Sequence, residues 1–306
     1  MLATSKRRGG FRMTAENHNS LDLPDCGLVL IGMGPGKFSS MTIEAKQAAM
    51  QCDSLRYEAY TALWPQDQLD LLEAECGQIT KVMRPEIESP ELLLQLAKSS
   101  LVGLLVVGDP LQATTHVDLQ LQAAEAGIEC ITFHGISITT IVTGAIGLSN
   151  YKFGRQTTLT YPYGGWVATS PLEVLAQNNH LNLHTLALLD LDPTGAGTGD
   201  QRPMQPEDAV SALMMMFTKL QDSVDEMQSD SALEIMRIEA CKQYLQTPIE
   251  QRIVVLCSDM GCSNEQIIST TVGQLSQLKG GRLNCLVFPS TMSDVEEAAL
   301  LRWNKE

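Results

Sequence analysis

The sequence is poor in positive charge. Its 306 residues include 21 Lys and Arg against 36 Asp and Glu, a formal net charge of −15. Non-specific affinity for nucleic acid comes mainly from clustered Lys and Arg, so this composition argues against a nucleic-acid-binding protein. Long hydrophobic runs are also missing. The longest, at 101–107 and 138–148, fall well short of the ~18–20 residues that a membrane-spanning helix needs, so we expect no membrane partner.

Signatures of metal sites and disulfides are absent as well. The eight cysteines contain no Cys-x-x-Cys pair, and the five histidines show no metal-ligand spacing. Most cysteines lie in apolar stretches, where a free thiol packs as a small hydrophobe. We expect reduced thiols in a cytoplasmic protein without a metal. No Ser/His/Asp order and no Cys/His pairing stands out, which favours a reaction that depends on positioning rather than on a side-chain nucleophile.

The first 26 residues have basic side chains near the start but no apolar segment, so they do not indicate a secretory signal. Acidic residues at 16, 22 and 25 fit a transit peptide poorly. We interpret residues 1–26 as a disordered extension.

Apolar strands alternate with helices between residues 27 and 134. Residues 27–31 and 101–107 are fully apolar and end in glycine turns, which is typical of buried strands. Further strands are predicted at 54–60, 79–83 and 128–133. Helices are predicted at 41–50 with Thr42 as N-cap, at 69–75, at 90–99 behind Ser89-Pro90, and at 116–126 before Gly127. This alternation predicts βαβ units and a parallel sheet that is covered on both faces.

The remainder of the chain does not show this regular alternation of strands and helices. Strands are predicted at 157–161, 185–191, 252–257 and 283–288, and helices at 171–178, 207–220, 231–245 and 264–274, with a loop rich in Gly and Pro at 192–206. We expect an α/β protein divided near residue 135. An N-terminal α/β domain with a mostly parallel sheet would span 27–135, and a C-terminal α/β domain would span 136–306.

Polar loops follow three of the predicted strands, at 32–36, 108–116 and 134–140. Ligands of open α/β sheets bind at the carboxyl ends of the strands, so these loops predict a small-molecule pocket with few charges. The turn Gly32-Met33-Gly34-Pro35-Gly36 lacks the dinucleotide fingerprint because Lys37 stands where the third glycine belongs, and it is not a P-loop. A plain tight turn at 32–36 and a capped turn at 108–116 remain alternatives.

Five segments together resemble the diphthine synthase family, which lies within the tetrapyrrole methylase superfamily. They are Leu30-Ile31-Gly32-Met33-Gly34-Pro35, Glu58-Ala59-Tyr60-Thr61, Gly108-Asp109-Pro110-Leu111-Gln112-Ala113-Thr114-Thr115-His116, Tyr151-Lys152-Phe153-Gly154 and His184-Thr185-Leu186-Ala187-Leu188-Leu189-Asp190. The segment 161–166 (YPYGGW) resembles the archaeal form. The likeness runs from about residue 27 to about residue 290.

The resemblance implies a fold of two α/β domains of the tetrapyrrole methylase type, with S-adenosyl-L-methionine in the interdomain cleft, and a homodimer. It implies an N-methyltransferase of diphthamide biosynthesis. The substrate would be translation elongation factor 2, whose 3-amino-3-carboxypropyl-histidine would be trimethylated on its amino group to give diphthine. The implied cofactor contacts are Pro35, Asp109, Gln112, Ser137, Ile138, Leu189, Met260 and Asn284.

The sequence departs from the family pattern at the last two of these positions. Where the family has L-A-R-[AV]-G, the chain reads Leu256-Cys257-Ser258-Asp259-Met260-Gly261, one residue longer, and Asn284 stands where the family often has His. No catalytic residue is assigned, although Glu58 and His116 are candidates for taking a proton from the attacking amine. Two other functions remain open: methylation of a tetrapyrrole such as a precorrin, and a non-catalytic relative of the family.

Overall fold

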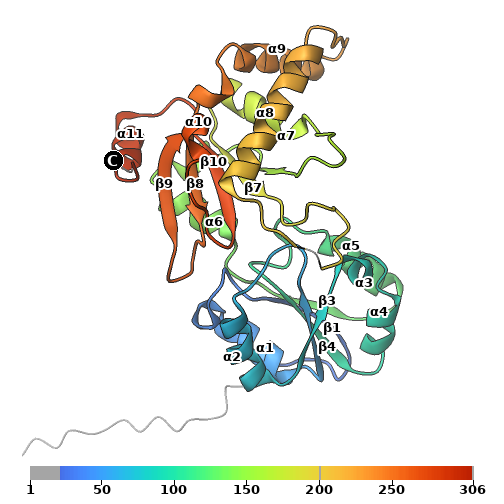
Figure 1. Cartoon of the computed structure of the whole chain (residues 1–306). Helices are drawn as coiled ribbons and strands as arrows, with labels where there is room; N and C mark the ends of the chain where they lie inside the picture. Colours follow the sequence, from blue (N-terminus) through green and yellow to red (C-terminus); the bar gives the residue numbers. More distant parts are fainter. Residues whose placement is uncertain (1–20, 200, 305–306) are drawn as a thin grey trace, which may run out of the picture.

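The computed structural model describes residues 21–199 and 201–304, which form two halves, each built around one five-stranded sheet (Figure 1). Of the extension expected at 1–26, residues 1–20 lie outside the described part, and 21–26 contain neither helix nor strand. Among the described residues, no helix combines the length and the hydrophobicity needed to cross a bilayer.

The first sheet has the strand order β3-β2-β4-β1-β5, and every pairing in it is parallel. Its strands are β1 Gly27–Gly32, β2 Ser54–Glu58, β3 Ile79–Val82, β4 Leu101–Val106 and β5 Cys130–Phe133. The expected βαβ alternation is therefore confirmed. The helices between these strands are α1 Ile43–Gln51, α2 Gln66–Cys76, α3 Arg84–Glu88, α4 Glu91–Ala97 and α5 His116–Glu125.

The central strand β1 is buried on both faces, which explains why its sequence is apolar without alternation. Val29 and Ile31 pack into one hydrophobic cluster, with α1 and α2, while Leu28 and Leu30 pack into a second, with α4 and α5. The helix start predicted at Thr42 is confirmed, since its side chain accepts a hydrogen bond from the Ala45 N–H at 3.1 Å.

The second sheet is mixed rather than parallel, with the strand order β6-β7-β10-β8-β9. Only the pairing of β6 with β7 is parallel. Its strands are β6 Thr157–Leu159, β7 Thr185–Leu189, β8 Ile253–Ser258, β9 Gln266–Thr271 and β10 Asn284–Phe288. The helices of this half are α6 Ile138–Ala145, α7 Ser170–His180, α8 Pro206–Ser223, α9 Ala232–Leu245, α10 Val272–Leu275 and α11 Asp294–Leu301.

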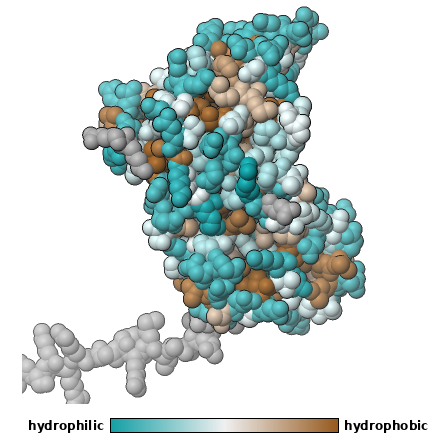
Figure 2. Space-filling view, in the orientation of Figure 1, coloured by the Kyte–Doolittle hydropathy of each residue, from teal (hydrophilic) through white to brown (hydrophobic). Residues whose placement is uncertain are grey.

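Helices cover both faces of the second sheet (Figure 1). Alternate residues of β10 point to opposite sides: Leu286 packs with residues of α7 and α8, and Val287 with residues of α6 and α11. The described residues also include three short 3-10 helices, at Phe38–Ser40, Asn150–Lys152 and Ile249–Gln251. The face of the molecule seen in Figure 2 is largely hydrophilic, with hydrophobic residues in small groups.

The helix predicted over 264–274 is wrong. Residues Gln266–Thr271 form the edge strand β9, which pairs with β8 along six residues, and only Val272–Leu275 are helical. The apolar side chains of this segment fit a helical period, but four of its six strand residues are β-branched. Such residues lose rotamer freedom in a helix and pack well on a sheet, so pairing with β8 decides the structure.

The helix start predicted at Ser89-Pro90 is also wrong. Ser89 is the C-cap of the unpredicted helix α3, and α4 begins at Glu91 with Pro90 as its N-cap. The Ser89 N–H donates to the Pro85 carbonyl and so closes α3, while the Pro90 carbonyl accepts the first hydrogen bond of α4, from the Leu94 N–H.

The three polar loops meet where β4, β1 and β5 end, and glycine permits their contact. A side chain on Gly32 would overlap the backbone nitrogen of Gly135, and one on Gly135 would overlap the carbonyl oxygen of Gly108. Gly34 and Gly108 also exchange two backbone hydrogen bonds, of 3.1 and 2.9 Å. The glycines therefore hold the three loops at backbone-to-backbone distance.

The buried carboxylate of Glu296 ties α11 to the second sheet. It is 4% exposed and accepts hydrogen bonds from the Ser149 N–H at 2.9 Å and from the His184 ring at 2.9 Å. The Lys152 ammonium lies 3.2 Å away. Burial alone would raise the pKa of Glu296, but hydrogen bonds from Ser293, Ser149 and His184 outweigh burial and hold that pKa well below its usual range.

We expect Glu296→Gln to destabilise the protein by roughly 2–4 kcal/mol at pH 7, because it removes a buried charge from its partners. A lowered folded-state pKa gives stability that is present above the unfolded-state value near 4.5 and is lost as pH falls through the folded value. Urea unfolding from pH 7 to pH 3 should therefore show the wild type and the variant converging below pH 4.5. Glu297→Gln, at the exposed neighbouring position, is the matched control. A gap that stays constant down to pH 3 would contradict this role.

We expect Gly32→Ala to lower the free energy of unfolding by about 3 kcal/mol or more, because a methyl group has no room between the loops. Gly144→Ala is the control: a side chain there meets nothing within 4 Å, the position is helical, and the change should stabilise the protein by about 0.5–1 kcal/mol. Chemical denaturation of both variants measures the difference. Equal denaturation midpoints for the two variants would show that the loops can move apart without loss of stability, which would contradict the prediction.

Candidate functional site

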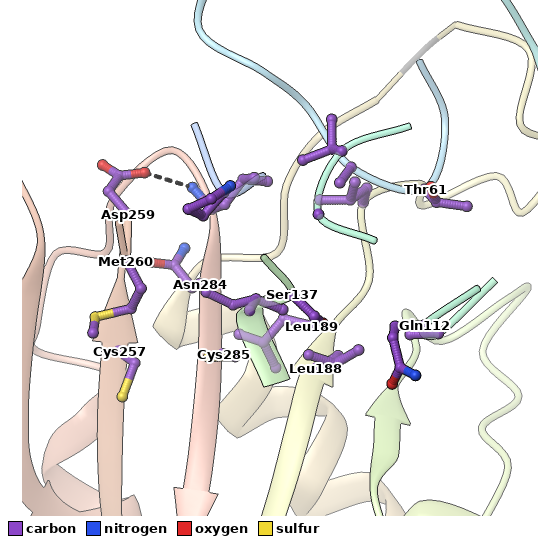
Figure 3. A pocket seen from close by; sticks show the side chains of 18 of the residues that line it. Thr61, Gln112, Ser137, Leu188, Leu189, Cys257, Asp259, Met260, Asn284 and Cys285 are labelled. Carbon is purple, nitrogen blue, oxygen red and sulfur yellow. Dashed lines mark hydrogen bonds between the residues drawn. The ribbon is translucent and has the colours of Figure 1, made fainter. Parts of the chain in front are cut away.

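A cavity lies between the two sheets and draws its walls from both halves. It encloses about 920 Å³, part of which is open to solvent. The loops after β1, β4 and β5 form one side, and the ends of β7, β8 and β10 form the other. In Figure 3, Cys257, Asp259 and Met260 stand across the cavity from Thr61 and Gln112. The cavity therefore lies at the carboxyl ends of the parallel strands, where ligands of α/β sheets bind.

A turn of the second half rests directly on the glycine turn of the first. A side chain on Gly261 would overlap the ring of Pro35, and one on Gly36 would come within 2.5 Å of Cys262 Sγ. The Cys262 thiol lies 3.9 Å from the Gly36 carbonyl oxygen. The glycine turn therefore contributes Pro35 to one wall of the cavity and also packs against the turn that forms part of the opposite wall.

Asp109 joins the polar loops on the cavity wall. Its carboxylate is 6% exposed and accepts hydrogen bonds from the His134 ring at 2.8 Å, the Leu111 N–H at 2.9 Å and the Gly135 N–H at 3.2 Å. Gly108 before it has φ of +76°, a conformation that glycine adopts without strain. These three donors fix the position of Asp109 on the cavity wall.

The structure brings all eight residues that were expected to contact a cofactor onto the wall of this one cavity. They come from six segments that are far apart in the sequence: Pro35, Asp109, Gln112, Ser137, Ile138, Leu189, Met260 and Asn284. That they hold a cofactor stays a prediction.

These residues differ in how much of their polar capacity is used within the protein. The Gln112 side chain forms no hydrogen bond with another described residue and is exposed. Ser137 caps α6, whose Thr139 N–H donates to its hydroxyl at 3.3 Å. The Asn284 amide is fully engaged: its oxygen accepts from Ser258 Oγ at 2.7 Å, and its nitrogen donates to the Met204 carbonyl at 3.2 Å. Asn284 therefore shapes the wall more than it offers free donors.

Neither candidate for the proton acceptor lines the cavity. Glu58 and His116 are both 0% exposed. Burial raises the pKa of Glu58, and hydrogen bonds from Thr61 partly oppose this rise. The Glu58 carboxylate accepts from the Thr61 hydroxyl at 2.5 Å and its N–H at 2.9 Å, while His116 Nδ1 lies 2.9 Å from the Pro110 carbonyl. Both side chains support the loops from behind, out of reach of a ligand in the cavity.

Two charged residues of the wall were not predicted as site residues. Asp259 and Arg282 both line the cavity. Asp259 is one of three non-glycine residues with positive φ among the described residues, at +48°, and Ala113 on the opposite wall is another, at +57°. Strained backbone of this kind gathers at functional sites. The one sequence signal for Asp259 was the extra residue between Cys257 and Gly261. A left-handed backbone conformation itself leaves no mark on amino-acid composition.

The wall combines apolar side chains with a few fixed polar groups. Such a lining suits a ligand with a flat ring, hydroxyl groups and an amino-acid end, because the apolar part excludes water and the polar groups orient the ligand. Among the described residues, no group of three His, Cys, Asp or Glu side chains could hold a metal ion. The eight cysteines are all free thiols.

Comparison with known proteins matches the model of the Tetrapyrrole (Corrin/Porphyrin) Methylases to residues 27–276. The diphthine synthase of Methanocorpusculum labreanum is 36% identical over 166 residues, which cover 54% of this chain and 66% of that enzyme. The diphthine synthase of Methanospirillum hungatei is 30% identical over 199 residues, which cover 64% of this chain and 76% of that enzyme.

A crystal structure of diphthine synthase has the same fold. It superposes with a TM-score of 0.72 at 24% identity, and the match covers 90% of this chain and 95% of that one. The family model spans most of the chain, from the first strand to α10. The chain therefore belongs to the tetrapyrrole methylase family and, within it, to the diphthine synthases.

Proposed function

We propose that this protein is an S-adenosyl-L-methionine-dependent N-methyltransferase that trimethylates the amino group of the 3-amino-3-carboxypropyl-histidine of translation elongation factor 2. The observation that carries the proposal is the convergence of eight cofactor positions, expected from six separate segments, on one cavity. Neither composition nor a single motif would bring them together. Membership of the diphthine synthases supports the same substrate.

The residues present fit the cofactor. Asp109 is a fixed carboxylate that can accept hydrogen bonds from ribose hydroxyls or from an amino group. Ile138, Leu189 and Met260 supply apolar surface for an adenine ring. S-adenosylmethionine, when bound, would supply a methyl group on a positively charged sulfur. The neutral thioether that remains after transfer is the leaving group.

The protein's part in this reaction is to bind and to align. Displacement at the methyl carbon needs the amine lone pair in line with the carbon–sulfur bond, and holding the two reactants in register can account for a large share of the barrier. The cavity wall supplies this alignment through backbone held by Gly32, Gly108 and Gly135. Its apolar side chains exclude water from the reacting atoms.

The amine has to be unprotonated when it attacks the methyl group. We propose that bulk water takes up the proton that the amine loses. The carboxylates on the described wall are Asp109 and Asp259, and both are occupied by N–H donors. Glu58 and His116 are buried behind the loops. We therefore propose no general base among the side chains.

We further propose that the chain acts in the cytoplasm as a homodimer, with an N-terminal domain at 27–135 and a C-terminal domain at 136–306. The two sheets, one on either side of residue 135, support this division. The net charge of −15 favours encounter with a protein loop that carries a cationic histidine derivative.

Mass spectrometry of elongation factor 2 tests the proposal directly. Factor that carries the 3-amino-3-carboxypropyl-histidine is incubated with this protein and S-adenosylmethionine. A gain of three methyl masses on that histidine is the expected result. A fourth methyl would place one group on the carboxylate and correct the proposed product. No gain, with the cofactor bound, would refute this substrate and favour another acceptor such as a tetrapyrrole.

We expect Asp109→Asn to weaken S-adenosylmethionine binding at least tenfold, because the amide keeps the shape of the side chain but loses its charge and part of its acceptor capacity. Titration calorimetry measures the dissociation constant. Asp118→Asn, on the exposed face of α5, is the matched control and should bind as the wild type does. An unchanged affinity in Asp109→Asn would mean that the cofactor lies elsewhere.

A further inference from the structure

The cavity wall carries one cation whose charge the protein does not balance. Among the described lining residues, the charged side chains are Asp109, Asp259 and Arg282. Arg282 is half-buried and forms no ion pair with any described acid. In a chain with a net charge of −15, an unpaired guanidinium on a cavity wall indicates a site for an anion.

The backbone of Arg282 is held by Asp259. The Asp259 carboxylate accepts hydrogen bonds from the Arg282 N–H at 3.2 Å, the Leu283 N–H at 3.0 Å and Asn264 Nδ2 at 2.6 Å. These donors occupy both of its oxygens, so this acid fixes the main chain beneath Arg282 instead of neutralising the guanidinium. The left-handed conformation of Asp259 brings its carboxylate to this place.

The guanidinium itself is anchored at one nitrogen. Arg282 Nη1 donates to the Leu63 carbonyl oxygen, which belongs to the other half of the molecule. The Arg282 side chain also hydrogen-bonds with the Cys262 thiol, so its partners within the protein are neutral groups. A guanidinium that has neutral partners and no carboxylate partner keeps its full charge for a ligand, and arginine can bind a carboxylate through two parallel hydrogen bonds.

We propose that Arg282 binds the carboxylate of an amino-acid group that enters the cavity. The proposal rests on the proposed function. Both reactants there carry such a group: the acceptor in its 3-amino-3-carboxypropyl chain and the cofactor in its methionyl part. Anchoring the acceptor carboxylate would fix its α-amine two bonds away, which is the placement that methyl transfer needs.

The test compares Arg282→Gln and Arg282→Lys with the control Arg56→Gln. Arg56 is also half-buried and also donates one hydrogen bond to a backbone carbonyl, that of Leu55, but it lies on β2 outside the cavity wall. Binding of S-adenosylmethionine and of its decarboxylated analogue is measured by calorimetry, and KM and kcat are measured with modified elongation factor 2. Thermal unfolding checks that each variant is folded.

An acceptor contact predicts that Arg282→Gln raises the KM for the factor at least tenfold and leaves cofactor affinity within about twofold. A cofactor contact predicts at least tenfold weaker binding of S-adenosylmethionine but not of the decarboxylated analogue. Either result supports the proposal, and Arg282→Lys should retain part of the effect in both. The proposal is overturned if Arg282→Gln and Arg56→Gln behave alike. If the wild type binds the cofactor but does not methylate the factor, the proposed substrate fails, while the calorimetric comparison still tests a contact between Arg282 and the cofactor carboxylate.

Discussion

Close contact between the backbones at Gly32, Gly108 and Gly135 is the constraint on which the site depends. A side chain at the first or third of these positions would collide with a neighbouring loop. The contact draws together the ends of three parallel strands, and the Asp109 carboxylate then bridges two of the loops by accepting from His134 and Gly135. The polar edge of the first sheet is therefore built mainly from main chain, and the Asp109 side chain cross-links it.

The second half completes the site by resting on that edge. Its 259–262 turn packs against the glycine turn, and Arg282 reaches back to the Leu63 carbonyl. The loop after β7 makes two more links, from the Gln201 amide to the Ala59 carbonyl at 2.9 Å and from the Arg84 N–H to the Gly197 carbonyl at 3.1 Å. The cavity wall thus depends on contacts between segments more than 80 residues apart, so a change in either half alters the space that a ligand meets.

The sequence predicts the first half well because its signals are local. Apolar strands, glycine turns and the Thr42 cap each act within a few residues, and the structure has all of them. The second half was harder to predict, because tertiary pairing overrides local pattern there: β9 is a strand only through its partner β8. Asp259 owes its place to a left-handed backbone conformation and Arg282 to a contact across the molecule, and the extra residue before Gly261 is the one trace of them in the sequence.

The arrangement also explains why no residue order typical of a nucleophilic enzyme appears in the sequence. A methyl donor with its own leaving group needs alignment, which the backbone framework would supply, and exclusion of water, which the apolar side chains of the wall would supply. Buried polar groups such as Glu58 and His116 then serve the loops, since they hold main-chain groups in place without reaching the cavity. On the cavity wall itself, the charged side chains are Asp109, Asp259 and Arg282, and the proposed carboxylate contact of Arg282 would add side-chain recognition to this backbone framework.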